Sequence, residues 1–374
     1  MKIKTKQADL CAALSKLKGV VPAKPAVPAL SFVKVTASSD GKGVSFLGTD
    51  IQVLVSAKMA CEVDADGDKA VLLPFAMLHS IVQTAPGGEL TLECKDGGKA
   101  SIKTATGLFR LQSLPSDQFP PVNRDADESK ATMPCSDLVE MLSRTKFAQA
   151  RPSETRAVLK SALLDIGKDG VVCVATNGRA LAKVEAEGCD APRQTKVVVP
   201  QGAVWEILRL ASGEGEGDVQ IIVPASGKYA IFAFKDAVLK TTLIDEQYPN
   251  WRQVVPVGDG DEVTVNSTSL VNAVRRASVL LSGLETQYVI LKFGRETITV
   301  TTPQTDYGDA TEKVKCECSA ERDFALSFDC NLLSDALTAA GAEKVTLSHF
   351  GDGKPLVISD GKRFYGLAMP MRMQ

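Results

Sequence analysis

The chain has 374 residues, 44% of them hydrophobic, and its 43 basic and 45 acidic residues leave a formal net charge of −2. This composition predicts two or three folded domains of roughly 150 residues each and argues against a disordered chain. A net charge near zero argues against tight binding of nucleic acid by charge alone, unless the cations gather on one face.

No apolar run approaches the roughly 18 residues that would be needed to cross a bilayer. The first residues, Met1-Lys2-Ile3-Lys4, alternate in charge and lack the apolar stretch of a signal peptide. We therefore expect a cytoplasmic protein.

Amphipathic helices are predicted at regular places along the chain. The first stripe of each set comprises Leu10, Leu14 and Leu17, then Leu138, Met141 and Leu142, then Leu270, Val274 and Leu281. The second stripe comprises Leu78, Ile81 and Val82, then Val204, Ile207 and Leu208, then Leu333, Ala336 and Leu337. Each second stripe leads through a Gly-bearing turn into an alternating strand, near 90–92, 219–221 and 345–347. The same order of elements is therefore repeated three times.

A period this long exceeds that of a solenoid repeat, so each unit should be a domain with its own core. In each unit the sequence predicts a strand, a helix, several strands, a second helix and further strands. Phe119-Pro120 and Tyr248-Pro249 mark extended exits, because proline disfavours a helical conformation in the residue before it. We predict an α+β fold with three tandem similar domains, 1–128, 129–257 and 258–374, each with two helices packed on antiparallel sheets.

The residues that usually carry catalysis are sparse. The two histidines, His79 and His349, fall in different repeats, which disfavours a catalytic dyad. The nine cysteines form no CxxC pair, and although Cys316 and Cys318 share one face of a strand, no second pair completes a zinc site. Nucleotide-binding and metalloprotease motifs are absent from the sequence. We expect a non-catalytic protein with no metal and no cofactor.

Cations recur on the first helix of each repeat or just beyond it: Lys16 and Lys18, then Arg144, Lys146 and Arg151, then Arg275 and Arg276. On one helix such residues indicate an ordinary solvated face. Their recurrence at the same place in three repeats favours a single surface with a positive field.

Four short motifs add a family resemblance. The C-terminal segment Met369-Pro370-Met371-Arg372 follows Tyr365 and a short apolar run. The segment 175–182 reads ATNGRALA, similar to a family pattern A-T-D-G-x-R-L-A, with Asn177 in place of Asp and Ala180 where Arg is usual. The segments 248–256 and 114–120 match two further family patterns. Over its whole length the chain resembles the bacterial sliding clamp, the beta subunit of DNA polymerase III.

The resemblance implies that two chains close head to tail into a ring of six domains of the DNA-clamp fold. The helices of such a homodimer line a hole that encircles duplex DNA without sequence preference. The implied function is that of a processivity factor, which tethers the replicative DNA polymerase. Further implied partners are the clamp loader and other polymerases and repair proteins with a clamp-binding peptide.

Three sets of site residues follow from the resemblance alone. The partner-peptide pocket would comprise Leu159, Thr176, Gly178, Arg179, Leu181, Pro249, Val254, Leu367, Ala368, Met369, Pro370, Met371 and Arg372. DNA would contact Lys24, Lys146, Arg151 and Arg275, and the dimer interface would hold Phe109, Leu111, Leu280 and Leu281. Ala180 and Gln253 stand where the family commonly has Arg, which thins the polar rim of the pocket and leaves the peptide preference open.

Other functions remain alternatives. A repeat scaffold or a single-stranded nucleic-acid-binding protein would need exposed aromatics on a basic groove, whereas aromatic residues make up only 5% of the chain. A hydrolase or transferase built from similar domains would need a convergent polar site, which the sequence does not indicate. A clamp should run in gel filtration as a dimer near twice 39.7 kDa.

Overall fold

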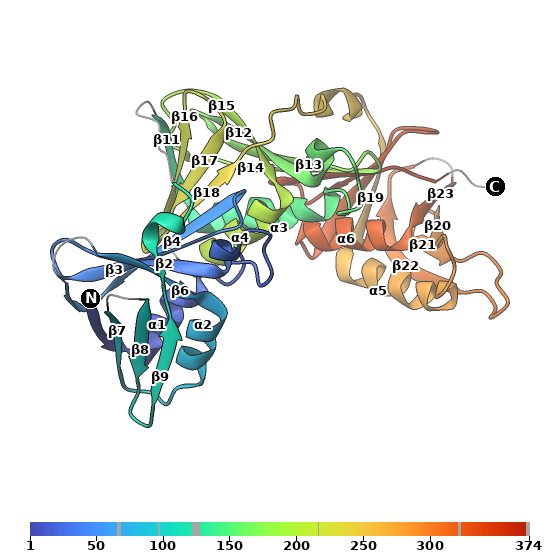
Figure 1. The fold of residues 1–374 in the computed structure, drawn as a ribbon. Coiled ribbons are helices and arrows are strands. Elements are labelled where there is room, and N and C mark those ends of the chain that lie inside the picture. The colour runs from blue at the N-terminus through green and yellow to red at the C-terminus, as the bar shows by residue number, and fades with distance from the viewer. Residues whose placement is uncertain (66–68, 96–97, 122–127, 216, 321–322, 372–374) are drawn as a thin grey trace. The chain divides into compact units, whose positions relative to one another are not determined.

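The computed structural model describes residues 1–65, 69–95, 98–121, 128–215, 217–320 and 323–371 (Figure 1). The first third contains β1 (Lys2–Lys6), α1 (Gln7–Ser15), β2 (Phe32–Ala37), β3 (Gly43–Thr49), β4 (Val53–Ala60), β5 (Glu62–Asp64), β6 (Ala70–Pro74), α2 (Phe75–Thr84), β7 (Glu89–Lys95), β8 (Lys99–Lys103), β9 (Leu108–Gln112) and β10 (Leu114–Pro115). The central third contains β11 (Glu128–Pro134), α3 (Cys135–Thr145), β12 (Ser161–Gly167), β13 (Gly170–Thr176), β14 (Ala180–Ala186), β15 (Thr195–Pro200), α4 (Gln201–Ala211), β16 (Asp218–Pro224), β17 (Tyr229–Ala233) and β18 (Ala237–Thr242). The last third contains β19 (Asp261–Asn266), α5 (Ser267–Ser278), β20 (Tyr288–Phe293), β21 (Thr297–Thr301), β22 (Thr311–Cys318), β23 (Phe324–Asp329), α6 (Cys330–Ala340), β24 (Lys344–His349), β25 (Leu356–Ser359) and β26 (Phe364–Ala368).

The predicted order of elements is confirmed in all three thirds, and both helices of each third lie at the predicted apolar stripes. Two stripes extend too far: α1 ends at Ser15, before Leu17, and α5 ends at Ser278, so that Leu281 lies in the 3-10 turn that follows. Local signals define the helix ends in the last third. The side chain of Asn266 accepts a hydrogen bond from Ser269 N at 2.9 Å and so caps α5. Asp329 caps α6 in the same way, and α6 ends at Gly341, whose φ of 65° suits glycine.

The chain divides into two compact units that do not coincide with its thirds. Unit 1 comprises 1–136 and 205–243, and unit 2 comprises 137–204 and 244–374. The central third therefore contributes to both units, because its strands join sheets that the other two thirds begin.

Unit 1 contains a five-stranded sheet in the order β5-β1-β7-β8-β9 and a nine-stranded sheet in the order β10-β6-β2-β3-β4-β18-β17-β16-β11. The larger sheet joins the first and central thirds where β4 pairs antiparallel with β18. Phe119 is buried against Leu72, which explains why the apolar motif at 114–120 follows the last strands of the first third.

Unit 2 contains a twelve-stranded sheet in the order β15-β12-β13-β14-β26-β25-β24-β19-β22-β21-β20-β23. Here β14 pairs antiparallel with β26, so that Leu181 lies opposite Leu367. Helices α5 and α6 lie side by side against the strands (Figure 1). Helix α5 buries Leu270, Val274 and Ala277 and leaves Arg275 and Arg276 exposed, as its amphipathic pattern predicts.

Candidate functional site

A hollow of about 510 Å³ lies in unit 2 beside the pairing of β14 with β26. Its lining comprises Thr176, Gly178, Arg179, Ala180, Leu181, Gln253, Val254, Val255, Pro256, Val257, Lys354, Pro355, Leu367 and Met369. The two strands supply one wall, the segment 253–257 supplies a second, and the turn before β25 supplies a third. The lining is mostly aliphatic, which is typical of sites that bind an apolar segment of a ligand or a partner.

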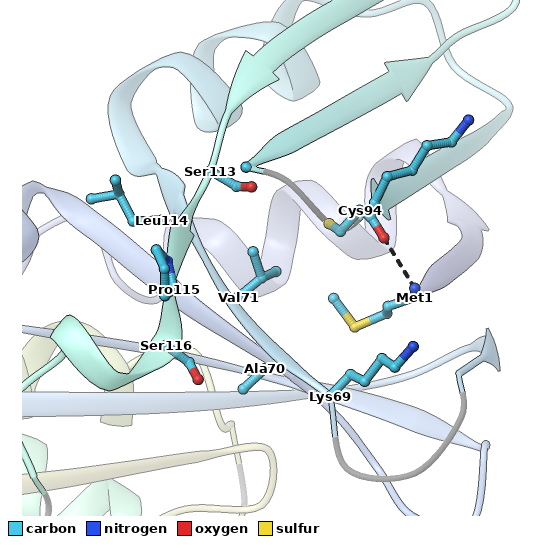
Figure 2. Close-up of a pocket in the computed structure, with 11 residues that line it drawn as sticks. Met1, Lys69, Ala70, Val71, Cys94, Ser113, Leu114, Pro115 and Ser116 are labelled. Atoms are coloured by element: carbon cyan, nitrogen blue, oxygen red, sulfur yellow. Dashed lines mark hydrogen bonds between the residues drawn. The ribbon is translucent and has the colours of Figure 1, made fainter.

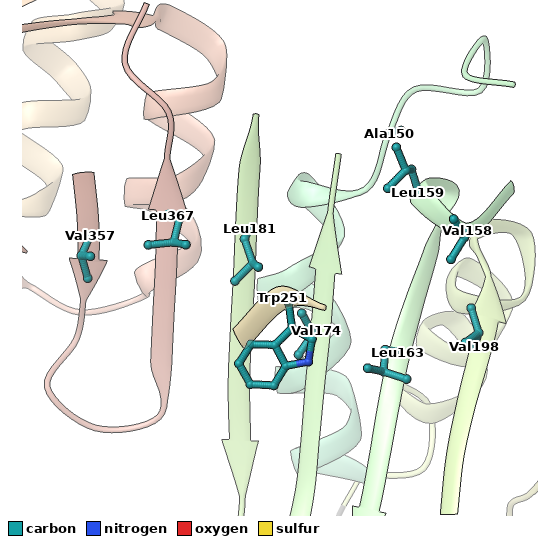
Figure 3. Close-up of a cluster of buried hydrophobic side chains, with 10 residues drawn as sticks. All are labelled: Ala150, Val158, Leu159, Leu163, Val174, Leu181, Val198, Trp251, Val357 and Leu367. Atoms are coloured by element: carbon teal, nitrogen blue, oxygen red, sulfur yellow. The ribbon is translucent and has the colours of Figure 1, made fainter. Parts of the chain in front are cut away.

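A buried hydrophobic cluster shares Leu181 and Leu367 with the lining of this hollow (Figure 3). It comprises Ala150, Val158, Leu159, Leu163, Val174, Leu181, Val198, Trp251, Val357 and Leu367. In Figure 3, Leu181 and Leu367 lie on adjacent strands and the Trp251 ring lies beside Val174. The Tyr248 hydroxyl donates to Val174 O at 3.2 Å, and burial raises the pKa of this phenol, so it remains a donor at neutral pH. The hollow is thus preformed on a packed core.

The turn between β13 and β14 shapes one edge of the hollow. Asn177 Oδ1 accepts from Arg179 N at 2.9 Å and from Ala180 N at 2.8 Å. Thr176 Oγ1 donates to Ala180 O at 2.7 Å, and Gly178 has a φ of 84° with open space where a side chain would begin. An Asn side chain provides the acceptor oxygen that an Asp would provide, so the departure at Asn177 is compatible with this turn.

The C-terminal segment continues this edge. Met369 N donates to Arg179 O at 2.9 Å, which holds the segment against the turn. Met371 N donates to Ser327 O at 2.7 Å, and Ser327 Oγ donates to Met371 O at 2.7 Å. The Met369 side chain is 40% exposed at the hollow, whereas Met371 is tied to β23.

The structure brings together seven of the residues assigned to the pocket from the sequence: Thr176, Gly178, Arg179, Leu181, Val254, Leu367 and Met369. Leu159 and Ala368 are buried, Pro249 is exposed away from the lining, and Pro370 and Met371 are half-buried. Arg372 lies outside the described residues.

Seven further lining residues were not predicted: Ala180, Gln253, Val255, Pro256, Val257, Lys354 and Pro355. Four of them, Ala180, Gln253, Val255 and Pro256, belong to motifs quoted from the sequence and could have been included, and Val257 directly follows one of those motifs. Lys354 and Pro355 had no sequence signal, because only the pairing of β25 and β26 brings their turn to the hollow.

The four predicted DNA contacts are exposed cations. Lys24 lies in the segment after α1, Lys146 and Arg151 follow α3, and Arg275 is in the last turn of α5. None of the four has a carboxylate within 4.0 Å in the part of the chain that the structure describes. Arg276, by contrast, is paired with Glu312 at 2.8 Å, which neutralises its charge locally.

The predicted interface residues differ in exposure. Phe109 is 42% exposed and Leu111 is half-buried on β9, the edge strand of the five-stranded sheet. Leu280 is half-buried in the 3-10 turn Val279–Leu281, but Leu281 is fully buried inside unit 2. The Leu281 side chain thus stabilises its own unit, and the exposed apolar neighbour is Val279, at 68%.

The described residues contain no group of three or more His, Cys, Asp and Glu side chains that could hold a metal ion. Burial raises the pKa of Cys173 to about 12 and that of Cys135 to about 11, so these thiols stay protonated at neutral pH. His79 is stacked on Phe75, and burial followed by the charge of Lys18 lowers its pKa, which favours the neutral ring.

A second hollow, of about 620 Å³, lies in unit 1 (Figure 2). The Met1 ammonium donates to Cys94 O at 3.0 Å at its edge. Burial raises the pKa of the Cys94 thiol to about 11, and the hydroxyls of Ser113 and Ser116 have no histidine among the lining residues to act as a base.

Comparison with known proteins identifies the class of the fold first. The structure matches the DNA polymerase III subunit beta of Pseudomonas aeruginosa with a TM-score of 0.90 at 23% identity, and a DNA polymerase sliding clamp of Bacillus subtilis with a TM-score of 0.92 at 22% identity, each over 100% of both chains. These likenesses show the DNA-clamp fold and confirm the predicted fold class.

Family models then match almost the whole chain. The N-terminal, central and C-terminal domains of the DNA polymerase III beta subunit match residues 1–123, 132–250 and 252–373. The chain belongs to this family. A beta sliding clamp from Synechococcus elongatus is 26% identical over 96% of this chain and 95% of its own length. No helix in the described part of the chain is long and apolar enough to span a membrane.

Proposed function

We propose that this protein is a DNA sliding clamp, a non-catalytic processivity factor. Two copies close into a ring around duplex DNA, and the ring tethers a polymerase through the hollow beside β14 and β26. The observation that carries the proposal is this preformed apolar hollow at the C-terminal segment of a chain that matches the beta-subunit family along its length. A tethered polymerase stays near its template at a high effective concentration, which is the physical basis of processivity.

The ring must hold DNA without gripping it. The exposed cations Lys24, Lys146, Arg151 and Arg275 supply phosphate contacts that carry no sequence information. The overall charge of −2 keeps the attraction weak enough for sliding.

Closure of the ring uses a head-to-tail contact that occurs twice. We assign one side to the edge strand β9, where Phe109 and Leu111 leave apolar surface beside unpaired backbone groups. The other side is the turn Val279–Leu281, where Val279 and Leu280 supply accessible apolar surface. Burial of two such patches stabilises the contact in proportion to the apolar area removed from water.

The partners follow from the hollow. It suits a short peptide that places apolar side chains against Leu181, Leu367 and Met369. The replicative polymerase, the clamp loader, and other polymerases and repair proteins would compete for it with related peptides. Such partners act on DNA inside the cell, and we place the protein with them in the cytoplasm.

Peptide binding tests this function. A fluorescent peptide with a Gln, a Leu and a terminal Leu-Phe pair should bind with modest affinity in an anisotropy titration. Val254→Asp should weaken this binding at least about tenfold, because Val254 is 53% exposed in the lining and a carboxylate there disfavours apolar contact. Val27→Asp is the matched control, since Val27 is 48% exposed in unit 1. Equal affinities for the Val254→Asp variant and the wild type would place the partner site elsewhere.

A further inference from the structure

The charged residues that line the hollow in unit 2 all have the same sign. Arg179 and Lys354 are the two charged members of the lining, and both are exposed. In the part of the chain that the structure describes, neither has a carboxylate within 4.0 Å, and no Asp or Glu lines the hollow. The rim therefore offers two uncompensated cations beside an apolar wall.

The backbone holds both cations at the rim. Arg179 lies in the turn that Asn177 closes, and its carbonyl accepts from Met369 N at 2.9 Å. Lys354 ends a turn in which its own N–H donates to Gly351 O at 3.3 Å, with Gly351 and Gly353 at φ values of 100° and 72°. Pro355 follows directly and restricts the backbone before β25. The backbone position of Lys354 is thus fixed by the turn at 351–354.

We propose that this hollow selects acidic partner peptides, in which an Asp or Glu side chain flanks the apolar anchors, and that Lys354 is the residue that sets this preference. The proposal rests on the function proposed above and specifies its ligand. A carboxylate at the rim gains attraction from two cations next to a low-dielectric wall and meets no like charge. A neutral peptide gains only the apolar contacts, so the difference between the two peptides isolates the electrostatic selection.

The test uses two fluorescent peptides with amidated C-termini, identical except that one carries Asp where the other carries Asn. Amidation removes the terminal carboxylate as a second source of negative charge. At low salt the wild-type protein should bind the Asp peptide about three- to tenfold more tightly, as expected for a partly exposed ion pair. The ratio should fall toward one as salt is raised, because screening weakens exposed charges.

Variants assign the preference to Lys354. Lys354→Gln should lower the ratio of the two affinities, with the remaining preference due to Arg179, and Lys354→Glu should bring the ratio to about one, because its carboxylate offsets the charge of Arg179. Lys362→Glu makes the same change of charge in the exposed turn after β25, outside the lining, and should leave the ratio as in the wild type.

Two different failures can be told apart. If both peptides bind wild type with equal affinity at low salt, or if Lys354→Glu keeps the wild-type ratio, the acidic preference is wrong while the peptide site stands. If neither peptide binds wild type, the proposed function fails and this preference fails with it.

Discussion

The Arg144 guanidinium and the Asp360 carboxylate form an ion pair of 2.6 Å inside unit 2, between α3 and the turn that joins β25 to β26. Arg144 Nε also donates to Ala339 O at 2.7 Å, a second nitrogen donates to Ala340 O, and the guanidinium lies 4.9 Å from the centre of the Phe364 ring. Arg144 thus satisfies the last carbonyls of α6, where a cation is also favoured by the helix dipole. One side chain connects the helices to the hairpin that ends in the pocket wall.

Replacing Arg144 should destabilise unit 2. The side chains of Arg144 and Asp360 are only 14% and 7% exposed, so Arg144→Ala leaves a buried carboxylate without its partner. We expect a loss of about 3–5 kcal/mol in the free energy of unfolding, measured by urea titration. Arg156→Ala removes the exposed partner of Glu154 and should cost much less stability, because solvent screens that pair. Equal losses in the two variants would contradict a structural role for the Arg144–Asp360 pair.

The same pair predicts a dependence of stability on pH. Burial by itself would raise the pKa of Asp360, but hydrogen bonds from Arg144 and from the amides of Phe364 and Lys362 outweigh it and hold the pKa below its usual range. The stabilisation is therefore complete above the unfolded-state pKa and is lost as pH falls through the lower folded-state value. Thermal unfolding between about pH 6 and pH 3 should show a smaller decrease in Tm for Asp360→Asn than for wild type. Parallel curves would mean that Asp360 does not contribute.

Many features of the fold could be predicted from the sequence. Stripes such as Leu138, Met141 and Leu142 have a helical period, and alternation marks strands such as the one at 345–347, so local pattern suffices for both. The predicted boundaries at 128 and 257 remain predictions. Strand pairing brings each part of the central third into a sheet with another third, and no local signal reports such pairing.

The site was less accessible to sequence reasoning, because burial depends on tertiary packing. Leu159 was predicted in the peptide pocket and Leu281 in the dimer interface, yet both side chains are buried in unit 2. In the sequence, Lys354 resembles an ordinary turn lysine. It lies at the rim of the hollow only because β26 pairs between β25 and β14. A motif therefore indicated where the pocket lies but not the full set of side chains that line it.

Charge substitution on β9 should open the ring. Phe109→Asp places a carboxylate in the proposed contact, and we expect monomers in sedimentation velocity at concentrations where wild type is dimeric. Phe109 is a better probe than Leu281, since an Asp at the buried position would also disrupt the core of unit 2. Val27→Asp again serves as the control and should sediment as wild type does. A dimeric Phe109→Asp protein would remove β9 from the interface.

Reversal of two proposed DNA-facing cations should weaken DNA binding without affecting assembly. We expect the double variant Lys24→Glu, Arg275→Glu to bind primed DNA more weakly, with a salt dependence whose slope is shallower by about 2. The control reverses Lys168 and Lys362, which are exposed in turns between strands. If both double variants lose the same affinity, the effect reflects net charge and not a defined surface.

Electron microscopy of the purified full-length protein tests the central claim most directly. The account predicts a closed ring of two copies with a central hole wide enough to admit duplex DNA, and six domains around its circumference. A monomer at every concentration, or a compact dimer with no central hole, would contradict it.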